Sequence, residues 1–262
     1  DGYGINESII EQAHADGVEV ILTCDNGISA FHQVELAKKY GMTVVITDHH
    51  EVPLDGEKEK IPPADAVIDP KQADCPYPFP EICGAVVAYK LVQVLYARRG
   101  VPQMEWLDLL EFAAIATVGD VMKLQDENRI LVKYGLKKMA QTKNIGLRRL
   151  AEKNNLDLGA ITAYHIGFVI GPCLNAGGRL KTAKEALALL RAQSEEEAER
   201  LAEELKELND TRKDMTEQGT EAAKLQVESW YQKDKVLVSF CRNAMNRWPG
   251  IIGRAPEGNI RS

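Results

Sequence analysis

Metal-binding side chains follow two strand-like runs of the sequence. The apolar run 42–47 ends in Asp48, His49 and His50, and Asp25 follows a similar run earlier in the chain. In an open α/β sheet, ligands bind at the carboxyl ends of the strands, so neighbouring parallel strands would bring these groups together. Carboxylates and imidazoles suit Mn²⁺ or Mg²⁺, whereas thiolate-rich sites favour zinc. The pattern predicts a metal-dependent active site.

The two adjacent histidines are expected to have different roles, because consecutive residues on extended backbone point to opposite sides. One ring would bind metal while the other faces the substrate. Asp120 is a further candidate, since it follows the apolar run 112–119 and a buried carboxylate needs a partner. Each carboxylate also has an ordinary alternative: Asp25 opens a good Asp-Asn-Gly turn, and Asp120 could be the polar end of a helix.

The elements that must position these residues alternate up to about residue 70. This spacing predicts βαβ units and a parallel sheet. Ser29 is expected to cap a helix that ends before Gly41, and a Pro-rich, charged loop is expected over 52–63. The expected strands are 18–24, 43–47 and 64–68, and the expected helices among them are 7–15 and 29–40.

From residue 83 the apolar period becomes helical, with helices expected at 86–95, 107–118, 129–140, 146–154 and 183–192. A long polar helix is expected from Ser194 to about residue 231. Ser194 and Glu197 match a capping box, and a narrow apolar stripe of leucines (Leu201, Leu205, Leu208) leaves most of that helix polar. Its length suggests a connector between domains.

The expected fold class is α/β, a parallel-sheet domain with helices on both faces and a helical second half. The expected domains are 1–193, the connector helix 194–232, and the truncated or divergent start of another domain at 233–262. The chain opens on Asp1 without an initiator Met, so it is expected to be N-terminally incomplete.

Composition narrows the class of protein. The five cysteines form no C-x-x-C pair, which argues against zinc and disulfides and favours the reducing cytoplasm. No apolar stretch approaches the roughly 20 residues of a membrane span. The net charge of −7 gives no general attraction to nucleic acid. Nucleic-acid binding would therefore rest on a local basic groove, or on metals that offset the carboxylates.

A second constellation combines Asn175, Gly177, Gly178 and Arg179, which are expected in a loop. Glycines let backbone approach a ligand closely, and a guanidinium can contact phosphate through two hydrogen bonds. Alone this pattern is weak, because such loops are common. The chain has neither the phosphate-binding G-x-x-x-x-G-K-[ST] pattern nor the dinucleotide pattern G-x-G-x-x-G.

Taken in order, seven motifs resemble the DHH phosphoesterase superfamily, and within it the RecJ-like branch of single-stranded-DNA-specific 5′→3′ exonucleases. The resemblance covers roughly 1–232. The motifs lie at 1–6, 23–27, 48–51, 68–70, 83–88, 116–121 and 175–180.

The resemblance implies a two-metal centre of Mn²⁺ or Mg²⁺ with Asp25, His49 and Asp120 among its ligands. Asp48 would support these ligands, and His50 and Arg179 would contact the scissile phosphate. The remaining members, Asn175, Gly177 and Gly178, would shape the substrate-binding loop. The implied reaction is hydrolysis of a phosphodiester by a metal-activated water, without a covalent intermediate.

The same resemblance implies single-stranded DNA as substrate in DNA repair and recombination, with a single-strand-binding protein and a helicase as partners and no membrane. Two features depart from the family. Its first Asp-rich motif would precede Asp1, and the segment after Arg254 does not continue the companion DHHA1 domain. Alternatives are an oligonucleotide or cyclic-dinucleotide phosphodiesterase, a manganese pyrophosphatase, or an inactive fragment that only binds.

Overall fold

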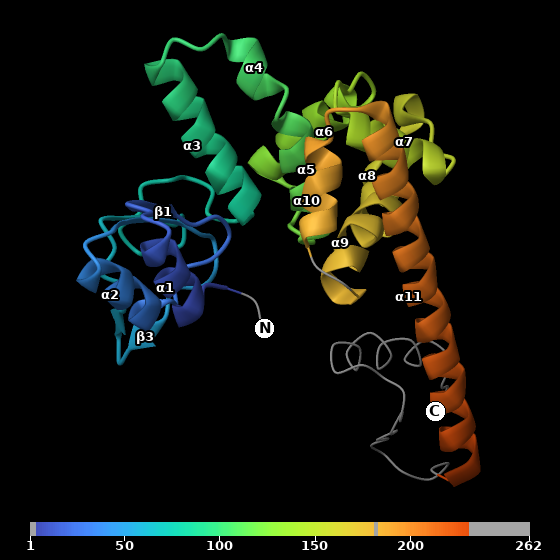
Figure 1. Ribbon diagram of the computed structural model, residues 1–262, viewed down its shortest axis with the longest axis horizontal. Coiled ribbons are helices and arrows are strands. Elements are labelled where there is room, and N and C mark those ends of the chain that lie inside the picture. The colour runs from blue at the N-terminus through green and yellow to red at the C-terminus, as the bar shows by residue number, and fades with distance from the viewer. Residues whose placement is uncertain (1–3, 181–182, 231–262) are drawn as a thin grey trace. The chain divides into compact units, whose positions relative to one another are not determined.

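The computed structural model describes residues 4–180 and 183–230 (Figure 1). The chain divides into two compact units, one of residues 1–142 with 158–167 and one of residues 143–157 with 168–262. The expected start of a further domain at 233 lies outside the described residues. The predicted boundaries at 193 and 232 therefore stay predictions.

The first unit contains the predicted parallel sheet. Strands β1 (Val20–Leu22), β2 (Thr43–Thr47) and β5 (Ala66–Ile68) pair in the order β1-β2-β5. Pairing continues past the strands, because the N–H of Asp25 donates to the Thr47 carbonyl at 3.0 Å and that of Asp48 to Ile68 at 3.0 Å. All three strands thus present their carboxyl ends at one edge.

Helices α1 (Glu7–Ala15) and α2 (Phe31–Lys39) supply the layer on one face of this sheet. Their buried apolar side chains form one cluster with those of the sheet, namely Ile10, Val34, Ala37, Met42, Val44 and Ile46. Helices were expected on both faces of this sheet. On the face opposite α1 and α2, among the residues that the structure describes, Val20 and Leu22 of β1 keep 58% and 55% of their surface exposed.

Two local expectations near this sheet are wrong. Ser29 does not cap α2: a turn closed by the Ala30 N–H and the Gly27 carbonyl (2.9 Å) delays the helix, and Ala30 becomes the N-cap without a side-chain bond. The segment expected as a loop contains a hairpin of β3 (Leu54–Asp55) and β4 (Lys58–Glu59). Gly56 is the first of the two turn residues and has φ 65°, a position where hairpin turns favour glycine. The expectation for Gly41, at φ 77° after α2, is confirmed.

The rest of the first unit is helical. Its helices are α3 (Gly84–Arg98), α4 (Gln103–Leu107), α5 (Leu110–Gly119), α6 (Asp126–Met139), the 3₁₀ turn η1 (Leu158–Ala160) and α8 (Ala163–His165). The helix expected at 107–118 is confirmed as α5, which begins at Leu110, and α4 is an additional short helix before it. Gly135 lets α6 approach α5 closely, because a Cβ there would lie 2.3 Å from that of Ala114. This packing fixes α5, whose end carries Asp120.

The second unit is built on α11 (Glu195–Trp230), which packs against α7 (Ile145–Lys153), α9 (Gly171–Leu180) and α10 (Lys184–Arg191). A π-helical segment, η2 (Ile166–Ile170), precedes α9. Figure 1 shows the first half of α11 beside α7 and α10, with its later turns extending past them. The buried stripe of that first half consists of Ala198, Leu201, Ala202, Leu205 and Asn209.

The predicted long helix is confirmed, and its capping box is half as expected. The Ser194 hydroxyl accepts the Glu197 N–H at 3.2 Å, whereas the Glu197 carboxylate accepts the N–H of Gln193 at 3.4 Å, one residue before the expected donor. Within the described residues, no helix is both long and apolar enough to cross a membrane.

Candidate metal centre

Asp25 leaves β1 in a tight turn. Its φ is 64°, an uncommon conformation for a residue with a side chain, and the Asn26 amide holds the turn by donating to the Cys24 carbonyl at 3.0 Å. Gly27 follows at φ 121°, where a Cβ would lie 3.0 Å from both Ile46 and Thr23. The turn that the sequence suggests is therefore present, and it aims the carboxylate at the edge of the sheet.

Gly84 is a residue of this centre that the sequence reasoning missed. A Cβ on Gly84, the first residue of α3, would lie 2.3 Å from Oδ1 of Asp25 and 2.7 Å from its Cα. The helix can approach Asp25 only because this position lacks a side chain. The available signal was a glycine at the start of an otherwise apolar helix, where no left-handed conformation calls for one.

Asp48 lies at the end of β2 with 1% of its surface exposed. One carboxylate oxygen accepts the Ile28 N–H at 2.9 Å; the other accepts the His49 N–H at 2.8 Å and contacts the His50 ring nitrogen Nδ1 at 2.7 Å. Burial alone would raise the pKa of Asp48, but these hydrogen bonds outweigh it and hold the pKa below its ordinary value. Asp48 thus holds the Ile28 backbone and both histidines through hydrogen bonds, and its role in a metal site stays a prediction.

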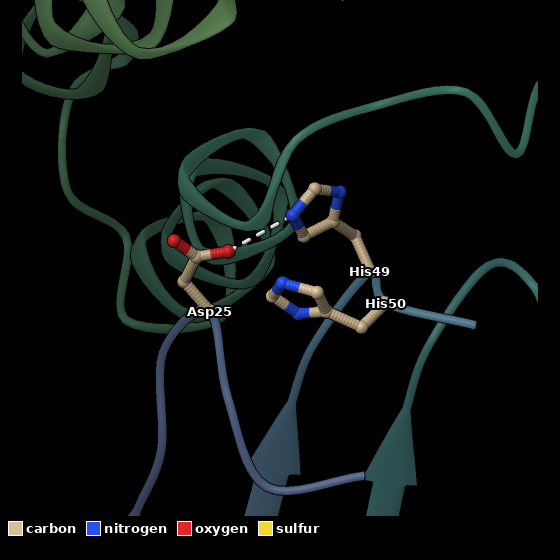
Figure 2. A group of neighbouring side chains, drawn as sticks. All are labelled: Asp25, His49 and His50. Atoms are coloured by element: carbon tan, nitrogen blue, oxygen red, sulfur yellow. Dashed lines mark ion pairs between the residues drawn. The ribbon is translucent and has the colours of Figure 1, made fainter. Parts of the chain in front are cut away.

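His49 is the centre of the cluster. Its Nε2 lies 3.0 Å from Oδ1 of Asp25 (Figure 2). The same atom lies 3.5 Å from Oδ2 of Asp120. The hydrogen bond to Asp25 raises the pKa of the imidazole; burial opposes this, and the negative charges of Asp25 and Asp120 add to it. One buried nitrogen therefore meets two carboxylates from different elements.

The expectation that the two histidines face opposite sides is wrong. The His50 ring lies beside the His49 ring, with centroids 4.7 Å apart. The extended strand ends at Thr47, and Asp48 then accepts both the backbone N–H and Nδ1 of His50, which bends the chain back. His50 remains 60% exposed at its side chain, so it borders solvent while His49 is enclosed.

Asp120 is the C-cap of α5, and its N–H donates to Ala116 at 2.8 Å. Burial raises the pKa of its carboxyl; the nearby His49 lowers it, and Asp25 raises it again. The polar helix end considered in the sequence is therefore real, but the carboxylate also faces the cluster. Helix α3 contacts both β2 and α5, and this packing brings Asp120 to the edge of the sheet, a contact that no local pattern predicts.

These side chains can hold a divalent cation. One ligand atom from each of Asp25, His49 and His50 lies within 4.8 Å of the others, and Asp120 adds a carboxylate oxygen 3.5 Å from Nε2 of His49. Carboxylate and imidazole ligands suit Mn²⁺ and Mg²⁺. A bound cation would also relieve the mutual repulsion of Asp25 and Asp120, which contributes to the raised pKa of Asp120.

The second constellation differs from its prediction. Asn175, Gly177 and Gly178 lie within α9, a helix rather than a loop, and Arg179 belongs to the same helix. Glycine has a low helix propensity, but burial outweighs it here, because Cys173 and Ala176 are fully buried where α9 packs against α11. Asn175 is exposed, and both glycines sit in the helix without a positive φ. This helix belongs to the second unit, so its proposed contact with substrate stays a prediction.

Comparison with known proteins identifies the class. Residues 3–117 match the model of the DHH family, N-terminal domain. This match covers the sheet, the Asp25 turn and the two histidines, so this part of the chain is a DHH-family domain.

Relatives that match most of the chain belong to one branch of this family. The chain is 36% identical over 253 residues to the single-stranded-DNA-specific exonuclease RecJ of Bacillus subtilis, covering 97% of this chain and 30% of that protein. A crystal structure of exonuclease RecJ bound to manganese aligns with TM-score 0.73 and 32% identity, covering 84% of this chain and 54% of that one. RecJ of Thermus thermophilus in complex with Mn²⁺ gives 0.71 and 32%, with 83% and 31% covered.

The predicted membership is thereby confirmed: this is a RecJ-like chain of the DHH family. The chain spans only 30% of the length of the B. subtilis relative. What the relatives do as whole proteins is therefore carried over to this chain only as a proposal.

Proposed function

We propose that this chain is the metal-binding part of a single-stranded-DNA-specific 5′→3′ exonuclease that hydrolyses phosphodiester bonds. One observation carries the proposal: carboxylates that follow β1 and α5 converge on one nitrogen, Nε2, of His49 after β2. The RecJ relatives, whose crystal structures contain manganese, support the metal and the substrate class.

In this proposal Asp25, His49 and Asp120 hold Mn²⁺ or Mg²⁺. The bound cations supply an activated water for attack on phosphorus and offset the charge of the transition state. Asp48 accepts from Nδ1 of His50 at 2.7 Å, and the imidazolium form of His50 can also donate from Nε2 to a non-bridging phosphate oxygen. Because the His50 side chain is 60% exposed, a phosphate can approach it without rearrangement of the chain.

Arg179, Asn175, Gly177 and Gly178 are proposed to contact the substrate from α9. A guanidinium adds two hydrogen-bond donors toward a phosphate. On this helix Asn175 and Gly178 share one side, whereas Gly177 is buried.

The partners are proposed on the same basis. Single-stranded DNA is the substrate, and a single-strand-binding protein and a helicase are partners by family resemblance. The cytoplasm is the proposed location, which agrees with four free cysteines among the described residues (Cys24, Cys75, Cys83 and Cys173).

The test measures Mn²⁺-dependent release of nucleotides from 5′-labelled single-stranded DNA, with duplex DNA, a dinucleotide and pyrophosphate as parallel substrates. His49→Ala and Asp120→Asn should each lower the rate by roughly 10³-fold or more, since each removes a ligand of the reacting centre. Asp65→Asn is the matched control, because that carboxylate pairs with Lys38 at 2.7 Å and lies outside the centre.

Each outcome decides between the proposals. Release confined to single strands from the 5′ end supports the exonuclease. Turnover of only the dinucleotide or pyrophosphate reassigns the chain to the oligonucleotide or pyrophosphate branch. Mn²⁺ binding without turnover of any substrate identifies it as a non-catalytic module.

A further inference from the structure

Asp69 borders the metal centre without a role in the proposed reaction. It follows β5, and the register that pairs Thr47 with Ile68 places it alongside Asp48. Only 1% of its surface is exposed. A buried carboxylate at the edge that binds the cation calls for an explanation, since burial of a charged group is costly unless it is paired.

Only one of the two oxygens of this carboxylate has a hydrogen-bond partner. Its Oδ1 accepts the Lys71 N–H at 2.9 Å and closes the turn through Pro70, whereas Oδ2 is buried without a hydrogen-bond partner. The pKa of Asp69 is raised, first by burial and then by Asp48, while a protonated His49 opposes this. His49 directly follows Asp48, whose N–H pairs with the Ile68 carbonyl beside Asp69, so the two residues lie next to each other at this edge.

His49 also has a buried polar atom without a hydrogen-bond partner. Its Nδ1 is buried and has no partner, and Figure 2 shows this nitrogen on the side of the ring away from Asp25. A neutral imidazole that gives the Nε2 lone pair to a metal must carry its proton on Nδ1. That N–H then needs a buried acceptor.

We propose that Asp69 is the positioning residue of His49: its Oδ2 accepts the Nδ1 hydrogen, directly or through one water molecule. This fixes the tautomer that presents the Nε2 lone pair to the cation, an arrangement common around metal-bound histidines. The inference rests on the proposed metal centre and assigns within it a residue that does not itself bind metal.

A purely structural role makes a different prediction. If Asp69 served only the turn, any side chain that accepts the Lys71 N–H would replace it. Asp69→Ser keeps one oxygen for that N–H and loses the second acceptor. Asp69→Asn has the shape of the parent and also keeps an oxygen for the Lys71 N–H. Its amide group would then face His49 as a donor, which favours the tautomer that carries its hydrogen on Nε2.

The experiment measures Mn²⁺ affinity by calorimetry and, in Mg²⁺-loaded protein, the exchange of the His49 Nδ1 hydrogen by ¹⁵N NMR, assigned with His49→Ala. Asp69→Ser and Asp69→Asn should each lower Mn²⁺ affinity by roughly 10- to 100-fold and abolish the slowly exchanging Nδ1 hydrogen. Asp65→Ser is the control and should keep both properties of the parent. Asp65 also accepts a backbone N–H, that of Val44 at 2.7 Å, away from the centre.

Parent-like affinity and an unchanged Nδ1 signal in Asp69→Ser overturn the inference. If Asp69→Ser does not fold, Asp69→Asn decides: loss of the protected Nδ1 hydrogen supports the inference, and protection like the parent's overturns it. A parent that binds Mn²⁺ but releases no nucleotide refutes the proposed exonuclease alone. A parent without measurable Mn²⁺ affinity refutes both.

Discussion

The metal edge (Asp25, Asp48, His49, His50 and Asp120) and the helical second unit treat their charges in opposite ways. At the metal edge, carboxylates on the ends of different elements gather around one imidazole, that of His49. In the second unit, charges of opposite sign alternate across the surface of α7 and α11, as in the contacts of Lys153 with Glu199 and Glu203, both at 2.6 Å.

The difference separates function from stability. Charges that satisfy one another, as on α7 and α11, need no ligand and contribute modestly to stability. Where several carboxylates surround one imidazole, some carboxylate oxygens remain available as ligands, and a cation can bind to them. A substitution in either region should therefore affect one property of the chain and spare the other.

The largest effect is expected on stability, from the buried stripe of α11. Leu205 is fully buried against the neighbouring helices, so Leu205→Ala should lower the free energy of unfolding by about 2–5 kcal/mol through lost burial and a residual cavity. Mn²⁺ affinity should stay at the parent's value. Chemical denaturation and calorimetry measure the two properties, with Leu225→Ala, 62% exposed on the same helix, as control. A parallel loss of Mn²⁺ affinity would break the comparison.

The next effect is expected at the metal edge. Gly84→Ala places a methyl group 2.3 Å from Oδ1 of Asp25 and close to its backbone, so Asp25 must shift. A displacement of about 1 Å in a reacting centre costs about 10²-fold, which is the expected loss in Mn²⁺-dependent turnover. Gly119→Ala is the matched control, because Gly119 precedes Asp120 and has no atom within 4 Å of the added methyl. Equal activities of the two variants would show that Gly84 does not position Asp25.

Sequence reasoning located this metal edge because strand ends are local features. The apolar run before Asp48 and the Asp-Asn-Gly turn after β1 are both read from neighbours in the chain, and the parallel order follows from the helix between them. The apolar run before Asp120 made this distant residue a candidate, and the order of the family's motifs then implied that it is a metal ligand. Its approach to His49 depends on the packing of α5, including the close contact at Gly135.

The errors have a common cause in contacts that local patterns do not contain. The directions of His49 and His50 depend on hydrogen bonds to Asp48 after the strand has ended. The helix α9 forms despite Gly177 and Gly178 because its buried side packs on α11. Asp69 looked like the end of a strand before a proline, and only burial reveals an oxygen without a partner.

Glu111 could break the comparison, because it is a buried carboxylate of the first unit outside the metal edge. Only 4% of it is exposed, its carboxylate accepts the Thr142 hydroxyl at 2.7 Å, and burial raises its pKa above the ordinary 4.5. A carboxyl with a raised folded-state pKa favours folding while protonated, so its contribution is fully present at low pH and is lost as pH rises above about 4.5 toward the folded value.

Glu111→Gln removes this titration and keeps an oxygen for Thr142. At pH 7 the variant should be more stable than the parent by on the order of 1 kcal/mol, and the gain should vanish below about pH 4. Urea denaturation across this pH range measures it. Mn²⁺ affinity should not change, because Glu111 is not a ligand and its buried carboxylate only lowers the stability of the fold at neutral pH. A loss of Mn²⁺ affinity would instead show that binding capacity at this edge extends along α5, and the separation of function from stability would fail there.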